Sequence, residues 1–116
     1  MNNIVLLVLL TLASPISIAN DVEFEYLGDW EGLSKVLYSV YGDMEITKEK
    51  VIFNYTGSYD YTVESASTDR VLIKLSKVMD CGQYIELKPS DSKLEFSVFN
   101  NMDSDYCAWG FYQRKI

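Results

Sequence analysis

Histidine is absent from this 116-residue chain. Its absence excludes Ser-His-Asp and Cys-His nucleophile activation, removes the commonest general base, and leaves zinc without its usual nitrogen ligands. The 17 acidic residues are scattered along the chain and form no recognisable catalytic pair. We therefore expect a protein that is not an enzyme and that carries no cofactor.

Metal-binding patterns are equally scarce. In the stretch NMDSD, Asn101, Asp103 and Asp105 alternate like the first ligands of an EF-hand calcium loop. The pattern then fails, because Tyr106 stands where the turn glycine should be and Tyr112 where the bidentate glutamate should be. A polar hairpin loop is the better interpretation, and no metal site is expected.

Basic residues are few. Ten Lys and Arg against 17 Asp and Glu give a formal net charge of −7. Nucleic acid is a poor partner for such a chain, because phosphate binding depends on Lys and Arg. The acidic balance favours encounters with a cationic protein, or it serves solubility alone.

Charged side chains are missing from the first 19 residues. The apolar run from residue 4 to residue 13 is shorter than the roughly 20 residues that span a bilayer, and Ser17-Ile18-Ala19 fits a cleavage site. We interpret residues 1–19 as a signal peptide, although the amino-terminal MNN lacks Lys and Arg, and an uncleaved anchor is the alternative. The prediction is a secreted or periplasmic single domain, residues 20–116, with no membrane insertion after cleavage.

Only two cysteines are present, Cys81 and Cys107. In an exported domain of this size the simplest interpretation is one disulfide bond between them, which would supplement a small core. Two free buried thiols are the alternative.

From residue 43 onward the sequence reads as short alternating segments separated by turn residues. In KLEFSVF, Leu94, Phe96 and Val98 face one side and their polar neighbours the other. The fold class predicted is all-β, a small eight-stranded antiparallel up-and-down barrel. The expected strands are 30–40, 43–47, 50–55, 59–65, 70–76, 83–88, 93–99 and 107–114, and the expected interior aromatics are Trp30, Phe53, Phe96, Trp109 and Phe111.

The segment 30–41 is ambiguous. Leu33, Val36, Leu37 and Val40 recur at helical spacing, while the β-branched and aromatic content of SKVLYSVY favours a strand. We expect a strand; the alternative is an α+β fold in which one short helix at 30–41 packs on an antiparallel sheet.

Gly28 and Trp30 at the start of the first strand, with Arg114 at the end of the last, resemble the lipocalin (calycin-like) arrangement. The resemblance implies that Trp30 and Arg114 pack together at the base of the barrel, and it implies a carrier of a small apolar ligand. The chain is shorter than a typical lipocalin and lacks the family's C-terminal helix. Its bulky interior candidates argue against a large cavity.

If the interior is full, recognition belongs to the outside. Tyr84, Tyr106 and Tyr112 fall at positions expected to face solvent, and tyrosine is common in protein interfaces. They are our candidate partner-binding residues; outward tyrosines that merely cover a sheet are the alternative.

The stretch YTGSYDY resembles the Ser-Gly-rich, Tyr-containing loop of periplasmic C-type lysozyme inhibitors. The resemblance adds Ser58 and Tyr59 to the candidate partner-binding residues. The sequence thus predicts an exported, non-enzymatic binding protein that recognises a small apolar ligand or a protein surface. The alternative function is an inhibitor or immunity protein against a cationic cell-wall hydrolase such as lysozyme.

Overall fold

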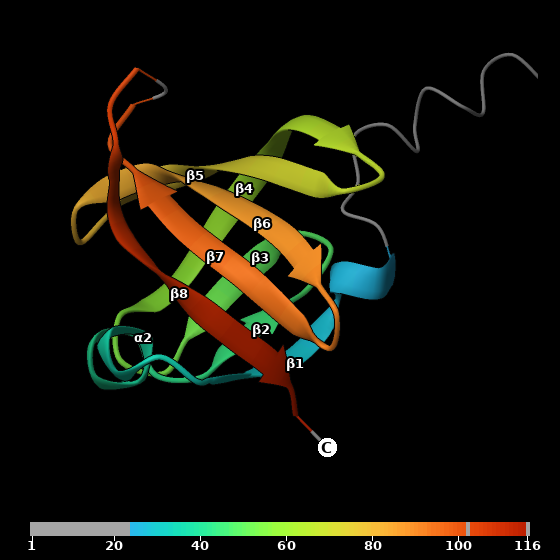
Figure 1. Ribbon diagram of the computed structural model, residues 1–116. Helices are drawn as coiled ribbons and strands as arrows, with labels where there is room; N and C mark the ends of the chain where they lie inside the picture. Colours follow the sequence, from blue (N-terminus) through green and yellow to red (C-terminus); the bar gives the residue numbers. More distant parts are fainter. Residues whose placement is uncertain (1–23, 102, 116) are drawn as a thin grey trace, which may run out of the picture.

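The computed structural model describes residues 24–101 and 103–115 and shows one closed barrel of eight antiparallel strands, confirming the predicted fold class (Figure 1). The predicted signal peptide, residues 1–19, lies outside the described residues. The elements are η1 (Phe24–Tyr26), β1 (Gly28–Gly32), α2 (Lys35–Val40), β2 (Met44–Ile46), β3 (Lys50–Phe53), β4 (Gly57–Ser67), β5 (Arg70–Met79), β6 (Gly82–Ser90), β7 (Lys93–Phe99) and β8 (Tyr106–Arg114).

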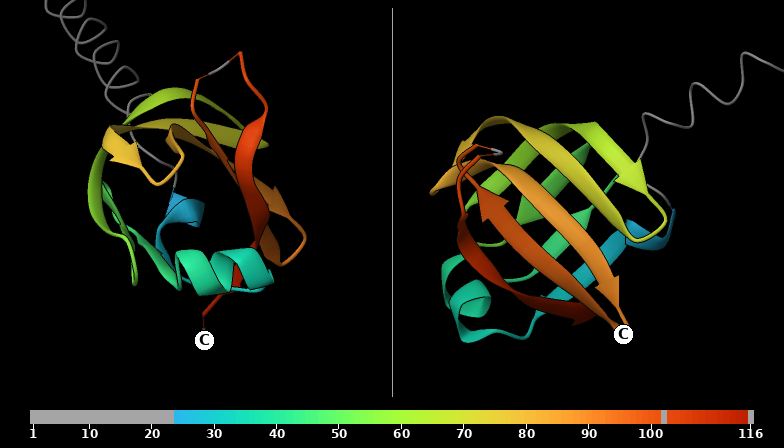
Figure 2. Two further views of the ribbon diagram at one scale, coloured as in Figure 1. Left: turned by 90° about the vertical axis from the view of Figure 1, so that its left-hand side faces the viewer. Right: turned by 45° about the horizontal axis from the view of Figure 1, so that its top comes forward.

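Each strand pairs with the next along the chain, and β8 returns to pair with β1. The pairing of β1 with β8 closes the barrel, and we call it the seam. At the seam, Trp30 of β1 lies opposite Arg114 of β8, and on its other side it lies opposite Met44 of β2. Closure gives every strand a neighbour on both sides, which removes the open edges of a flat sheet. Helix α2 lies at one end of the barrel and η1 at the other (Figures 1 and 2).

The segment 30–41 contains the end of a strand followed by a short helix. Strand β1 ends at Gly32, and the predicted continuation to residue 40 is wrong because α2 occupies Lys35–Val40. Leu37 is the buried residue of this helix, whereas Val36 and Val40 remain exposed. A helix thus forms here despite the β propensity of the segment, and of the four apolar residues at helical spacing it buries Leu37 in the end of the barrel.

Strand β8 faces the opposite way from the prediction. Ala108 and Tyr112 point into the barrel and are buried, while Cys107, Trp109 and Phe111 lie on the outer side. A register shift between Val98 and Phe99 in the β7–β8 pairing marks a bulge at the start of β8.

Gly110 explains why this side of β8 faces inward. A Cβ at Gly110 would lie 2.6 Å from Ser34 Oγ and 2.8 Å from Leu37 Cγ, so only a glycine lets the start of α2 approach the strand. Ser34 Oγ also accepts a hydrogen bond from Phe111 N, at 2.9 Å. The glycine thus admits the helix to the inner side of β8.

We expect Gly110→Ala to lower the free energy of unfolding by about 1–3 kcal/mol, because the added methyl overpacks a site filled by α2. Urea unfolding followed by circular dichroism measures the loss. Ser58→Ala, a change of similar size at an exposed strand position, should stay within about 0.5 kcal/mol of the parent. Equal stability of Gly110→Ala and the parent would contradict the close contact.

Aromatic rings fill the interior. The centroid of Phe96 lies 5.3 Å from Tyr112, 5.8 Å from Phe53 and 5.9 Å from Tyr41, in edge-to-face arrangements. Tyr41 donates a hydrogen bond to Asp80 Oδ2, and Tyr112 donates one to the carbonyl of Gly42, both at 3.1 Å. Burial raises the pKa of both tyrosines far above the ordinary value, so both hydroxyls stay protonated.

The predicted disulfide bond is present between Cys81, in the turn between β5 and β6, and Cys107 in β8. Its Cα atoms are 6.1 Å apart. The bond ties the β5–β6 turn to the start of the last strand, and it is compatible with an extracellular or periplasmic location.

Candidate protein-binding face

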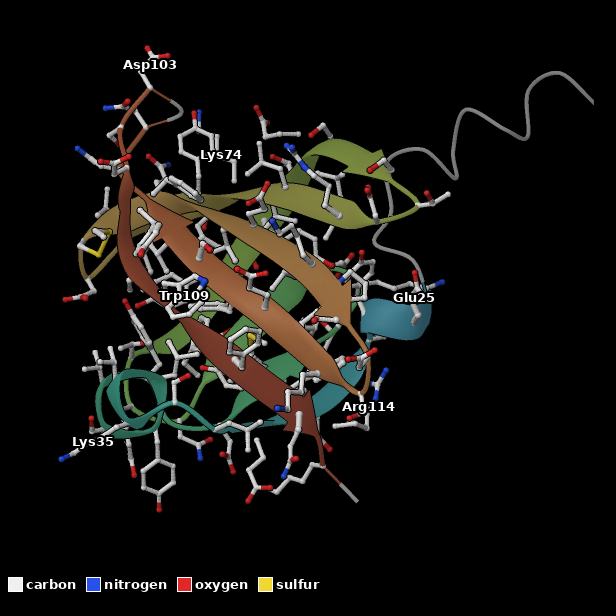
Figure 3. All side chains as sticks on the ribbon, in the orientation of Figure 1. Glu25, Lys35, Lys74, Asp103, Trp109 and Arg114 are labelled. Carbon is white, nitrogen blue, oxygen red and sulfur yellow. A yellow bond between two sulfur atoms is a disulfide. The ribbon has the colours of Figure 1, made fainter. Side chains whose placement is uncertain are left out.

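The base of the barrel carries the contact that the lipocalin resemblance implied. The guanidinium carbon of Arg114 lies 4.1 Å from the centroid of Trp30, and Arg114 donates hydrogen bonds to the carbonyls of Leu27 and Glu25 (Figure 3). Trp30 in turn donates from Nε1 to the carbonyl of Tyr26, at 3.0 Å. These contacts fasten η1 to the end of the barrel, so their role here is structural.

A row of aromatic side chains crosses the outer side of three strands. Tyr84 of β6 lies opposite Phe99 of β7, and Phe99 lies opposite Tyr106 of β8. Residues paired across a sheet project to the same side, so the three rings form one transverse row. Lys74 of β5, which pairs with Tyr84, extends the row and lies 5.7 Å from that ring.

A second line of rings runs along β8. Trp109 lies with its centroid 6.2 Å from Tyr106 and 5.3 Å from Phe111. Its indole Nε1 donates a hydrogen bond to Glu95 Oε2 of β7, at 2.7 Å. Figure 3 shows Trp109 over the outer side of the β7–β8 hairpin. The carboxylate therefore holds a largely apolar ring in a fixed position on the surface.

These two lines make up what we call the aromatic face. Its most exposed members are Tyr106, 54 % exposed, and Trp109, 41 % exposed. The remaining members are half-buried, and they support the two exposed rings from the side. The aromatic face consists of Tyr84, Phe99, Tyr106, Trp109 and Phe111.

The candidate tyrosines divide between surface and interior. Tyr84 and Tyr106 lie on the aromatic face, joined through Phe99. The expectation that Tyr112 is exposed is wrong: its side chain is 0 % exposed, because β8 has the opposite facing from the predicted one. The sequence prediction missed Trp109 and Phe111 as surface residues for the same reason.

The YTGSYDY stretch also divides. Ser58 is exposed at the start of β4, whereas Tyr59 is buried and donates its hydroxyl to the carbonyl of Thr56, at 2.9 Å. Tyr59 therefore belongs to the interior, where its ring meets Phe53 edge to face. A partner that docks on this stretch reaches Ser58 but not the Tyr59 ring.

The β7–β8 hairpin adds negative charge to the aromatic face, while Lys74 of β5 and Lys88 of β6 lie on the same outer side. Between Lys93 and Arg114 the sequence has three acidic residues, Glu95, Asp103 and Asp105, and no basic residue. Asp103 stands at the projecting β7–β8 loop (Figure 3). The three ion pairs found among the described residues involve none of these acids; they join Lys50 to Asp60, Arg70 to Glu86 and Lys115 to Asp43.

A second apolar surface borders this face at α2. Leu33, Val36, Tyr38 and Val40 are exposed around the helix, and Tyr55 is exposed in the turn after β3. Leu33 N donates to the carbonyl of Phe111, at 2.9 Å, so Leu33 adjoins the end of the aromatic face.

Across 24–101 and 103–115, no group of three or more Cys, Asp and Glu side chains is placed to hold a metal ion. Within the same ranges, neither helix has the length and apolar character needed to cross a membrane.

Comparison with known proteins adds no family to this description. No protein-family model matches the chain, and no significant match to it was found among curated proteins or solved structures.

Proposed function

We propose that this protein is an exported, non-enzymatic binding protein with a lipocalin-like barrel, and that it recognises the surface of a cationic protein through the aromatic face. The observation that carries the proposal is the position of Trp109 and Tyr106. Both are large, exposed aromatic side chains beside acids that form no ion pair among the described residues.

The filled interior favours a protein partner over a small apolar ligand. An eight-stranded barrel is just wide enough for its own side chains or for one small ligand. Here Tyr41, Phe53, Phe96 and Tyr112 pack against one another across the centre of the barrel. A lipocalin-style ligand would have to displace these rings, at the cost of their packing energy.

Composition favours the aromatic face as the contact. Tryptophan and tyrosine are enriched among the residues that dominate binding energy in protein interfaces. A ring already fixed by a hydrogen bond, as Trp109 is by Glu95, loses little conformational entropy when a partner docks.

Charge favours a cationic partner. With a net charge of −7 the protein attracts basic proteins at long range, and Glu95, Asp103 and Asp105 place part of that charge at the aromatic face. Such complementarity raises association rates and makes them sensitive to salt. A cell-wall hydrolase such as lysozyme is one cationic protein of this kind, so inhibitor or immunity activity is a special case of the proposal.

The proposal predicts selective capture of a basic protein. Immobilised residues 20–116 should retain a basic protein from the exported fraction of the source cells, and the double variant Tyr106→Ser/Trp109→Ser should not. The captured protein should be released at about 1 M salt, where the Debye length falls to ~3 Å. Mass spectrometry identifies it, and circular dichroism checks that the variant folds.

A control for charge is Glu45→Gln, which removes one negative charge from an exposed position on β2, away from the aromatic face. It should capture the same protein as the parent. Equal capture by the parent and the double variant would reject the aromatic face as the contact. A small molecule bound to the parent in native mass spectrometry would instead support the carrier function. Loss of lysozyme activity at a saturating concentration of this protein would identify it as a lysozyme inhibitor.

A further inference from the structure

We propose that the aromatic face binds an arginine side chain of its partner, with the guanidinium stacked on the Trp109 ring and paired with the Glu95 carboxylate. The proposal rests on the proposed function, because a protein partner supplies the arginine. It specifies the chemical group that the face recognises.

Trp109 is placed to receive a flat cation. Tyr106 and Phe111 flank its ring along β8, and its indole nitrogen is bound by Glu95, so the ring is held in place while 41 % of the residue stays exposed. Indole is the best of the aromatic side chains at attracting a cation. The ring therefore offers a rigid platform on the surface.

Glu95 has capacity for a further donor. Its Oε2 accepts the indole N–H, and its Oε1 accepts none of the hydrogen bonds found among the described residues. Lys88 lies opposite Glu95 on β6, yet this pair is not one of the three ion pairs in that part of the chain. The carboxylate thus keeps an oxygen for a cation beside the Trp109 ring.

The same chain already uses this chemistry elsewhere. The guanidinium carbon of Arg114 lies 4.1 Å from the Trp30 ring centroid while the guanidinium donates to two carbonyls. The Nζ atom of Lys77 lies 5.2 Å from the Tyr59 ring centroid. The third cation–ring contact among the described residues joins Lys74 to Tyr84, so none of the three involves the Trp109 ring. This exposed tryptophan therefore has a free position for a cation from outside.

Arginine fits this site better than lysine. Its planar guanidinium can stack on an indole and donate in its own plane to a carboxylate at the same time. The lysine ammonium is a compact, strongly hydrated charge that stacks less well. Discrimination between the two is the property that separates this proposal from simple attraction of positive charge.

The two indole N–H groups of this chain allow a direct test. A nitrogen-15 NMR titration of residues 20–116 with the peptide acetyl-Gly-Arg-Gly-Arg-Gly-amide should shift the Trp109 indole signal saturably, with a Kd on the order of 1–10 mM. The Trp30 indole, which is bound to Tyr26 in the interior, should not move. The matching lysine peptide should bind at least about threefold more weakly.

Glu95→Gln is the decisive variant, because a glutamine can still accept the indole N–H while it lacks the charge. We expect it to weaken binding of the arginine peptide at least about fivefold, whereas Glu45→Gln, with the same loss of charge on another strand, should bind like the parent. The proposal is overturned if the Trp109 signal stays fixed at about 20 mM peptide, if the lysine peptide binds as well, or if Glu95→Gln binds unchanged.

This test is independent of the capture experiment. Binding of the arginine peptide without capture of a basic protein would retain the site and reject the proposed partner. Capture without discrimination between the two peptides would retain the partner class and reject the arginine site.

Discussion

Phe96→Ala is expected to lower the free energy of unfolding by about 3–5 kcal/mol, the largest effect of any single substitution considered for this protein. Phe96 is 0 % exposed, and its ring meets Tyr41, Phe53 and Tyr112. Its removal deletes buried surface from the centre of the barrel. Strands β3, β7 and β8 and the end of α2, which carry these rings, cannot collapse into the space. The cost therefore includes both the lost burial and the cavity.

Urea unfolding followed by circular dichroism measures this loss. The matched control is Phe111→Ala, the same deletion on the outer side of β8, for which about 1 kcal/mol is expected. Domains of this size are stable by roughly 5–15 kcal/mol, so Phe96→Ala could leave little folded protein. Phe96→Leu, expected to cost about 1 kcal/mol, then keeps the comparison measurable. Equal losses at positions 96 and 111 would contradict an interior built around Phe96.

Replacing both cysteines, Cys81→Ser with Cys107→Ser, is expected to cost about 3.5 kcal/mol. The bond closes a loop with a sequence separation of 26, and the chain entropy that it removes from the unfolded state grows with the length of that loop. Without the bond, the β5–β6 turn and the start of β8 are held only by backbone hydrogen bonds to the neighbouring strands and by side-chain packing.

Thermal unfolding of the double variant measures the effect. Since 1 kcal/mol shifts the melting temperature of a small domain by about 4–8 °C, the expected fall is about 14–28 °C. Treating the parent with a thiol reductant should reproduce it, whereas the reductant should leave the double variant unchanged. A melting temperature equal to that of the oxidised parent would mean that the bond contributes nothing to stability.

The strands were predictable wherever alternation was strict. In 93–99 the order Leu94, Phe96, Val98 gave the correct bounds and the correct inner side, because a barrel strand must alternate between interior and solvent. The same argument located β4, β5 and β6 to within a few residues. Period-two patterning carries this information locally, so no knowledge of the partner strands was needed.

The position of β8 in the sequence was predicted correctly, but the side of the strand that faces the interior was predicted wrongly. The apolar pattern of β8 does not distinguish the two sides. Every residue from Tyr106 to Tyr112 except Gly110 is apolar or aromatic, so alternation does not distinguish the two sides. The deciding contact is made between Gly110 and the start of α2, about 75 residues earlier in the chain. A contact between distant segments leaves no local periodic signal, and the aromatic face was therefore only half visible from the sequence.

The site was predicted where it lies on strands of clear pattern. Tyr84 could be placed outside because it shares one side of β6 with Glu86 and Lys88. Tyr106 was expected on the same outer side as Tyr112 and Arg114; it is exposed although Tyr112 is buried, because the bulge at the start of β8 changes the alternation between them. Trp109 was expected in the interior with Phe111, on the same side of the strand, and the observed facing of β8 places both rings outside. The hydrogen bond to Glu95 depends on the β7–β8 register, which single-sequence reasoning does not supply.

The order of the strands also has a kinetic consequence. Seven of the eight pairings join strands that are consecutive in the chain, and these can form as hairpins from nearby residues. The β1–β8 seam is different, because it closes a loop of nearly the whole domain and must await a largely ordered barrel. Trp30 lies on this seam opposite Arg114. We therefore expect its fluorescence to change in the last phase of folding, after the hairpins have formed.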